Sequence, residues 1–161
     1  MATTLLETAK KYIEHFAALD TQLLESVLAE NHTHQFAPAS LNLYGPFDKQ
    51  GMLEHNEDLR SILTGFPVTA KEYIVSEGSN QVTVWATSQT HFRNDVKDEG
   101  IATDEWVYEG EYIFLFSMDK TGEKITRTIE FLDSKKTVEQ LLGLMNRAKK
   151  NREKRLASKV T

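Results

Sequence analysis

The chain has 161 residues, of which 40% are hydrophobic and 27% charged, values typical of a globular protein. This composition excludes a disordered or collagen-like chain, and at this length we expect a single domain over residues 1–161. The sequence contains no cysteine, which excludes disulfide frameworks, thiolate zinc sites, iron–sulfur clusters and cysteine nucleophiles.

The formal net charge of −5 is unevenly distributed along the chain. Residues 146–161 carry seven Lys or Arg and one Glu, so the rest of the chain is strongly acidic. An acidic body repels the phosphate backbone, and we expect no nucleic-acid partner. The basic run is typical of a solvated helix end, because cations are favoured near a helix C-terminus; contact with an anionic surface is the alternative.

No stretch approaches the ~20 apolar residues that are needed to span a membrane. The N-terminal segment carries Glu7, Lys10 and Lys11 where a signal peptide has its apolar core, so the segment is interpreted as a helix. We therefore expect a cytoplasmic protein with no membrane partner.

Two helices are predicted at the start of the chain. Thr4 and Glu7 form a capping-box pattern that marks the start of the first. Asp20 is an N-cap candidate for the second, shorter helix. The apolar residues recur at helical spacing in both segments: Leu5, Ala9, Tyr12, Ile13 and Phe16 in the first, and Leu23, Leu24, Val27 and Leu28 in the second.

A short strand, a loop and a third helix follow. The strand is expected over His32–Ala37, and the loop over Leu41–Phe47 contains a Gly-Pro turn signal. Asp48 is the N-cap candidate of the third helix, which Gly65 and Pro67 end. Its predicted apolar face holds Met52, His55, Leu59, Ile62 and Leu63.

After this helix the hydrophobic period changes from 3.6 to 2, which predicts strands. Four strands are expected, over Val68–Glu77, Gln81–Arg93, Glu105–Met118 and Lys124–Asp133. The longest break between them is the charged segment Asn94–Thr103. A second capping box, Thr137 with Gln140, is expected to start a last helix.

Helices that cluster early and long strands that cluster late favour an α+β fold over an alternating α/β fold. We expect the helices to pack on one curved antiparallel sheet and to form a cone. Small-molecule sites favour such concave, mostly apolar spaces.

Three segments carry a resemblance to a known superfamily: His32–Ser40 (HTHQFAPAS), Trp106–Tyr112 (WVYEGEY) and Ile125–Phe131 (ITRTIEF). Together with the element order, they resemble the SnoaL-like or NTF2-like (cystatin-like α+β barrel) superfamily from about Leu5 to Met145. Within it the chain resembles small fungal enzymes of secondary metabolism, including isomerases of the tetrahydroxanthone type and catalysts of indole-alkaloid rearrangement. The superfamily also contains transport factors and non-catalytic binding modules, so fold alone does not fix function.

Alternate residues on the strand Glu105–Met118 share a face. One face is aromatic and consists of Trp106, Tyr108, Gly110, Tyr112, Phe114 and Phe116. This face suits a flat, conjugated ligand, and Gly110 leaves a gap between two tyrosines where a ring fits. An aromatic core stripe is the alternative interpretation.

Glu130 follows two threonines on one face of the last strand, in an otherwise apolar region. Desolvation raises the pKa of a carboxyl group in an apolar cavity, as a general acid or base near neutral pH requires. A structural ion pair is the alternative. The resemblance implies a Tyr/Tyr/Glu acid–base set, which matches Tyr108, Tyr112 and Glu130. The carboxylate that ketosteroid-isomerase-like members carry near the end of the first strand is absent here, where the sequence is Phe36-Ala37-Pro38.

Histidine is suited to proton transfer near neutral pH. His34 and His91 are candidate catalytic residues, and His55 is a candidate cavity residue on the third helix. His15 is interpreted as structural. The complete set of candidate substrate-binding residues is Trp106, His55, Phe36, Phe114 and Thr128.

His32 and His34, two apart on a strand, have the spacing of a metal-binding pair, but a site needs a third ligand that the sequence does not supply. There is no dinucleotide fingerprint, P-loop or nucleophile elbow. We therefore expect neither a metal nor another cofactor.

The sequence thus favours a cofactor-free isomerase or cyclase that acts by acid–base catalysis on a polycyclic polyketide-type metabolite. A dehydratase on a similar substrate and a non-catalytic binding or dimerisation module are the alternatives. The expected partners are a small aromatic or polycyclic substrate and a second copy of the chain, as a homodimer.

Overall fold

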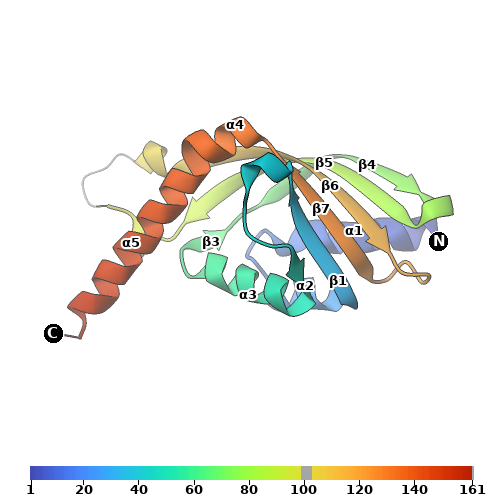
Figure 1. Ribbon diagram of the computed structural model, residues 1–161, viewed down its shortest axis with the longest axis horizontal. Coiled ribbons are helices and arrows are strands. Elements are labelled where there is room, and N and C mark those ends of the chain that lie inside the picture. The colour runs from blue at the N-terminus through green and yellow to red at the C-terminus, as the bar shows by residue number, and fades with distance from the viewer. Residues whose placement is uncertain (99–102, 161) are drawn as a thin grey trace.

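The structure is a computed structural model that describes residues 1–98 and 103–160 (Figure 1). The helices are α1 (Ala2–His15), α2 (Thr21–Val27), α3 (Lys49–Arg60), α4 (Ser134–Lys136) and α5 (Leu142–Ser158), with a π-helical turn over Thr137–Leu141 between the last two. The strands are β1 (Leu28–Ala37), β2 (Phe47–Asp48), β3 (Leu63–Gly65), β4 (Val68–Ser76), β5 (Gln81–Phe92), β6 (Val107–Met118) and β7 (Ile125–Leu132).

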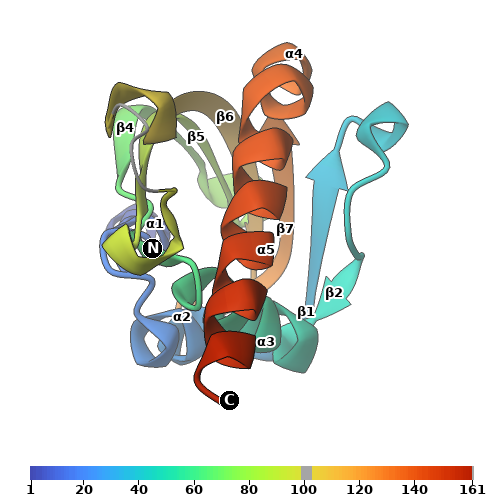
Figure 2. The ribbon, with the colours of Figure 1, turned by 90° about the vertical axis from the view of Figure 1, so that its left-hand side faces the viewer.

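The strands form one curled sheet in the order β2-β1-β7-β6-β5-β3, with β4 also paired to β5. β1 runs parallel to β7, and the other strand pairs that the structure describes are antiparallel. A parallel pair requires a long connection, which here comprises α3 and the strands β2 to β6. Helices α1, α2 and α3 lie beneath the concave face, and α5 crosses its open side (Figures 1 and 2). The predicted α+β cone is confirmed, but the sheet is mixed and not wholly antiparallel as predicted, because β1 pairs in parallel with β7.

Two predicted helix caps are confirmed. The Asp20 side chain accepts a hydrogen bond from the backbone N–H of Leu23, and the Asp48 side chain accepts one from Gly51. Each carboxylate satisfies a backbone donor that the first helical turn leaves free.

The two predicted capping boxes are wrong. Helix α1 begins at Ala2, so Thr4 lies inside it. At the other end of the chain, Asp133 accepts from the backbone N–H of Lys136 and starts the helix one turn before Thr137. The Thr137 side chain is buried instead, and its hydroxyl lies 3.4 Å from that of Tyr108.

Several strand ends differ from the prediction. β1 begins at Leu28, although the helical spacing predicts this residue in the second helix. Helix α3 ends at Arg60, and Leu63 belongs to the short strand β3, which pairs with β5. Trp106 lies in a 3₁₀ turn before β6. Of the predicted break at Asn94–Thr103, residues 94–96 form a 3₁₀ turn, and residues 99–102 lie outside the described residues.

The predicted alternation along β6 and β7 is confirmed, and the structure shows which face points inward. On β6 the aromatic residues and Gly110 point inward, while Glu109 and Glu111 are exposed. On β7 Thr128, Glu130 and Leu132 are buried. The alternation places the aromatic face and the carboxylate of Glu130 on the concave side of the sheet, beneath the helices.

The N-terminal part of α5 packs against the rest of the protein, and its C-terminal end extends away from the other elements (Figure 1). Arg147 pairs with Asp98 and lies over the Trp106 ring, with the guanidinium carbon 5.2 Å from the ring centroid. Residues 152–160 are exposed, as expected of a solvated basic helix end. Among residues 1–98 and 103–160, no helix combines the length and hydropathy that crossing a membrane requires.

Candidate active site

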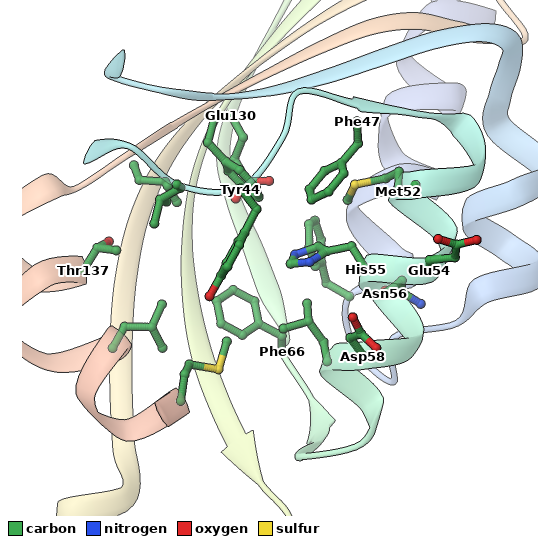
Figure 3. Close-up of a pocket in the computed structure, with 18 of the residues that line it drawn as sticks. Tyr44, Phe47, Met52, Glu54, His55, Asn56, Asp58, Phe66, Glu130 and Thr137 are labelled. Atoms are coloured by element: carbon green, nitrogen blue, oxygen red, sulfur yellow. The ribbon is translucent and has the colours of Figure 1, made fainter. Parts of the chain in front are cut away.

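A cavity of about 440 Å³ lies between the concave face of the sheet and α1, α3, α5 and the segment before β2 (Figure 3). Its volume is in the range of small-molecule sites. Most of its wall is apolar. The aromatic side chains that line it are Phe16, Phe36, Tyr44, Phe47, Phe66 and Tyr112.

Glu130 supplies a carboxylate to this wall and is only 7% exposed. Its Oε1 atom lies 3.4 Å from Nε2 of His34, whose side chain is fully buried. On the other side of the same imidazole, Nδ1 lies 3.4 Å from the Tyr12 hydroxyl. Glu130 on β7, His34 on β1 and Tyr12 on α1 therefore form a series of neighbouring side chains. Glu130, at one end of this series, lines the cavity.

The state of Tyr12 determines how this series is protonated. Burial, and then the charge of Glu130, raise the pKa of Tyr12 well above its usual range, so the phenol keeps its proton. When that phenol donates to Nδ1 of His34, the proton of a neutral His34 is on Nε2 and faces Glu130. The series can thus hold a proton beside the carboxylate.

Tyr112 contributes a second polar group. Ser88 donates a hydrogen bond to its hydroxyl oxygen over 3.0 Å, and the Tyr112 hydroxyl in turn donates to that of Tyr108. Burial raises the pKa of Tyr112 well above its usual range, so the group stays a donor. A Cβ atom on Gly110 would collide with this hydroxyl. The gap at Gly110 is therefore filled by Tyr112 itself, and the predicted place for a ligand ring is wrong.

His55 forms part of the opposite wall. Its ring stacks on Phe47, with centroids 5.1 Å apart and an interplanar angle of 24°. In Figure 3 both rings point into the cavity, whereas the Glu54 carboxylate points away from it. Burial is the main cause that lowers the pKa of His55 to about 4. His55 is therefore neutral near pH 7, and it contributes an aromatic ring and no positive charge to the cavity wall.

Apart from His91, the predicted site residues separate into three groups. Glu130, Tyr112, His55 and Phe36 line the cavity together. His34 and Thr128 are fully buried behind the wall, beside Glu130 in the sheet. Trp106, Tyr108 and Phe114 are buried outside the set that lines the cavity.

His91 does not belong to the site. It is exposed on β5, where it pairs with Val107 on the outward face of the sheet. The alternation along β5 directs its neighbours Thr90 and Phe92 inward instead. A catalytic role for His91 is therefore inconsistent with its position.

Sequence reasoning missed several residues of the site. Tyr12 is predicted on the apolar face of the first helix and His15 as a structural residue, although two polar rings three residues apart on one helix are an available signal. Tyr44 and Phe47 were placed in a loop, with no local pattern to link them to a cavity. Three apolar residues near the C-terminus also line the cavity: Leu141 in the π-helical turn, and Leu142 and Met145 in α5.

The pair His32 and His34 does not form a chelate. His32 donates through Nδ1 to the Ile125 carbonyl oxygen over 3.0 Å, and the two rings lie 6.3 Å apart. In the described part of the chain, no three His, Cys, Asp or Glu side chains gather as metal ligands.

No family model and no curated protein sequence matches the chain, but many solved structures resemble its fold. BvnE pinacolase from Penicillium brevicompactum has a TM-score of 0.72 and 19% identity over 85% of this chain and 91% of its own. PrhC from Penicillium brasilianum has a TM-score of 0.73 and 18% identity over 94% and 93%. AusH from Aspergillus nidulans has a TM-score of 0.68 and 21% identity over 83% and 86%.

Other similar structures are described as SnoaL-like or as having a cystatin-like fold. Sequence identities this low establish the fold and leave the activity open. The chain therefore has the cystatin-like α+β fold of SnoaL-like proteins, as the resemblance of its sequence implied.

Proposed function

We propose that this protein is a cofactor-free isomerase or cyclase that acts by acid–base catalysis on a polycyclic, polyketide-type metabolite of the tetrahydroxanthone kind. One observation carries the proposal: a nearly buried carboxylate, Glu130, reaches an aromatic-walled cavity and lies 3.4 Å from the imidazole of His34. A carboxylate in such surroundings is suited to exchange protons with a bound carbon acid.

Glu130 is the proposed base. Its carboxylate takes a proton from a carbon next to a substrate carbonyl, and the electron pair of that C–H bond moves to form an enolate. The imidazole of His34 lies beside this carboxylate, with Nε2 3.4 Å from Oε1. Return of the proton to a different atom of the enolate gives the isomer, so no atom is gained or lost.

Tyr112 is the proposed donor to the enolate oxygen. Ser88 donates to the Tyr112 oxygen, and the phenolic hydrogen would turn from Tyr108 to a ligand in the cavity. A preorganised donor of this kind stabilises the negative charge that develops on oxygen. Tyr108 is not proposed as a direct donor, because its hydroxyl lies beside Thr137.

The walls favour a flat, aromatic substrate. Aromatic side chains offer large apolar faces against which a fused ring system stacks. The similar structures agree with this class of chemistry, since one is a pinacolase and two are described as polyketide cyclases.

Deuterium exchange tests the proposal without knowledge of the natural substrate. In D₂O, the protein should accelerate loss of the proton signals next to the carbonyl of 2-tetralone, a bicyclic ketone. The matched control is Glu123→Gln, which changes an exposed carboxylate on the turn before β7 and should leave the rate unchanged. If polycyclic ketones bind tightly but deuterium exchange is not accelerated, the non-catalytic binding module is favoured instead. If the protein removes water from a hydroxylated ketone, the dehydratase is favoured.

We also propose that the outer face of the sheet joins two copies of the chain. Trp85, Ile113 and Phe131 pair across β5, β6 and β7 and form an apolar row on this face. Val107 and Ile74 are also exposed there, at 54% and 56%. An exposed apolar area of this extent is typical of an interaction surface.

A further inference from the structure

One buried histidine of the cavity wall has no role in the proposed reaction, and it lies at the C-terminal end of α1. His15 is fully buried and lies in the cavity wall next to Phe16. Its ring packs against Phe16 with centroids 4.1 Å apart and meets Tyr12 edge-on at 5.0 Å. These contacts fix the orientation of the imidazole.

The hydrogen bond of His15 determines its tautomer. Nδ1 of His15 bonds to the backbone carbonyl oxygen of Tyr12. A carbonyl oxygen only accepts, so Nδ1 carries the ring proton and donates. Burial is the main cause that lowers the pKa of His15 to about 4, so the ring is neutral near pH 7 and Nε2 carries a free lone pair.

Nε2 of His15 is a hydrogen-bond acceptor that the protein leaves unmatched. It is buried and has no hydrogen-bond partner among the described residues. The two nitrogens of an imidazole point in nearly opposite directions, so Nε2 faces away from the α1 backbone. Because an unmatched buried acceptor is costly, such groups mark places where a ligand or water donates.

We infer that His15 is a specificity-determining residue, which accepts a hydrogen bond from a hydroxyl group of the substrate through Nε2. The inference rests on the proposed function and deepens it: the substrate carries a phenol, enol or alcohol O–H at the end of the cavity next to α1. A ketone or ether oxygen at that position would place two acceptors against each other, and the site would reject it.

His32 offers a matched control. It is equally buried, its Nδ1 also donates to a backbone carbonyl oxygen, and burial is again the main cause that lowers its pKa to about 4. Its Nε2 is likewise unmatched. Unlike His15, His32 lies outside the residues that line the cavity.

Calorimetric titration with 2-naphthol and with 2-methoxynaphthalene tests the inference. The natural protein should bind 2-naphthol about tenfold more tightly than its methyl ether, the value of one net hydrogen bond. His15→Leu should bind both compounds equally, whereas His32→Leu should keep the preference. Binding of the ether also reports that each variant is folded.

If His15→Leu keeps the preference for 2-naphthol, the inference is overturned. Nitrogen-15 NMR of the natural protein gives an independent result should that variant fail to fold. It should show a His15 ring with the proton on Nδ1, whose Nε2 signal moves with 2-naphthol and not with the ether; a proton on Nε2 contradicts the inference. Because neither measurement involves turnover, the inference and the proposed function can fail separately: absence of deuterium exchange counts only against the latter.

Discussion

Nε2 of His34 and Oε1 of Glu130 lie 3.4 Å apart on β1 and β7, the two strands that run parallel. In the register of that pair, His34 lies opposite Thr128, and Phe36 lies opposite Glu130. The two titratable side chains are therefore diagonal neighbours on one face of the sheet. Their contact depends on the strand pairing that also shapes the cone.

The imidazole of His34 should support Glu130 rather than react with the substrate. We expect His34→Gln to slow deuterium exchange into 2-tetralone, by less than the ~10²–10⁴-fold typical of removing the acid–base group itself. The pH profile of the rate should also shift, since Glu130 loses the imidazole that lies 3.4 Å from its carboxylate. The matched control is His91→Gln, which changes an exposed histidine and should alter neither quantity. An unchanged pH profile in His34→Gln would contradict this role.

Stability should fall as the pH drops from about 6.5 to about 4. Burial lowers the pKa of His15 and of His32 to about 4 in the folded protein, whereas an unfolded histidine titrates near ~6.5. In that window the unfolded chain binds protons that the folded chain does not, so acid favours unfolding, by up to about 3 kcal/mol for each histidine.

Urea unfolding at pH 7 and pH 5 measures this effect. The free energy of unfolding should be lower at pH 5, and the difference between the two pH values should shrink in His32→Leu. Equal stability of the natural protein at both pH values would show that these histidines become protonated inside the fold.

Gly110 should be required for the position of Tyr112. A Cβ atom at residue 110 would collide with the Tyr112 hydroxyl and lie 2.9 Å from Oγ of Ser88. We expect Gly110→Ala to destabilise the protein by about 1–3 kcal/mol, as overpacking does. Gly143→Ala is the control, because nothing lies within 4 Å of its new Cβ atom and alanine favours a helix by about 1 kcal/mol. Equal melting temperatures for the two variants would argue against the packing described.

The apolar row on the outer sheet face should hold a homodimer together. Sedimentation at micromolar concentration should give twice the chain mass of 18.4 kDa. Phe131→Ser, a change at a side chain that is 48% exposed, should shift the protein toward the monomer without loss of folding. A natural protein that sediments only as a monomer would refute the proposed interface.

Local patterns in the sequence predicted much of this fold. Period-two alternation predicted which residues share a face with Tyr112 and with Glu130, and the carboxylates of Asp20 and Asp48 marked two helix starts. These features depend on neighbouring residues, so a single sequence carries them. The same alternation alone did not exclude His91, because it does not indicate which face of β5 is concave.

The remaining features depend on contacts between distant segments. The parallel pairing of β1 with β7, which joins His34 to Glu130, leaves no local signature. Tyr12 and His15 occupy positions that an apolar helix face also explains, and their role becomes visible only when the cavity is located. Thr137 resembles a helix cap, but Asp133 supplies the cap one turn earlier.

Glu130→Gln tests the central claim most directly, because it keeps the shape of the side chain and removes its proton chemistry. Deuterium exchange into 2-tetralone and the melting temperature should be measured on the same preparation, beside Glu123→Gln. The exchange rate should be lower by ~10²–10⁴-fold, with folding retained. A Glu130→Gln protein that melts at a lower temperature but exchanges at the natural rate would contradict the claim, and would make Glu130 a structural partner of His34.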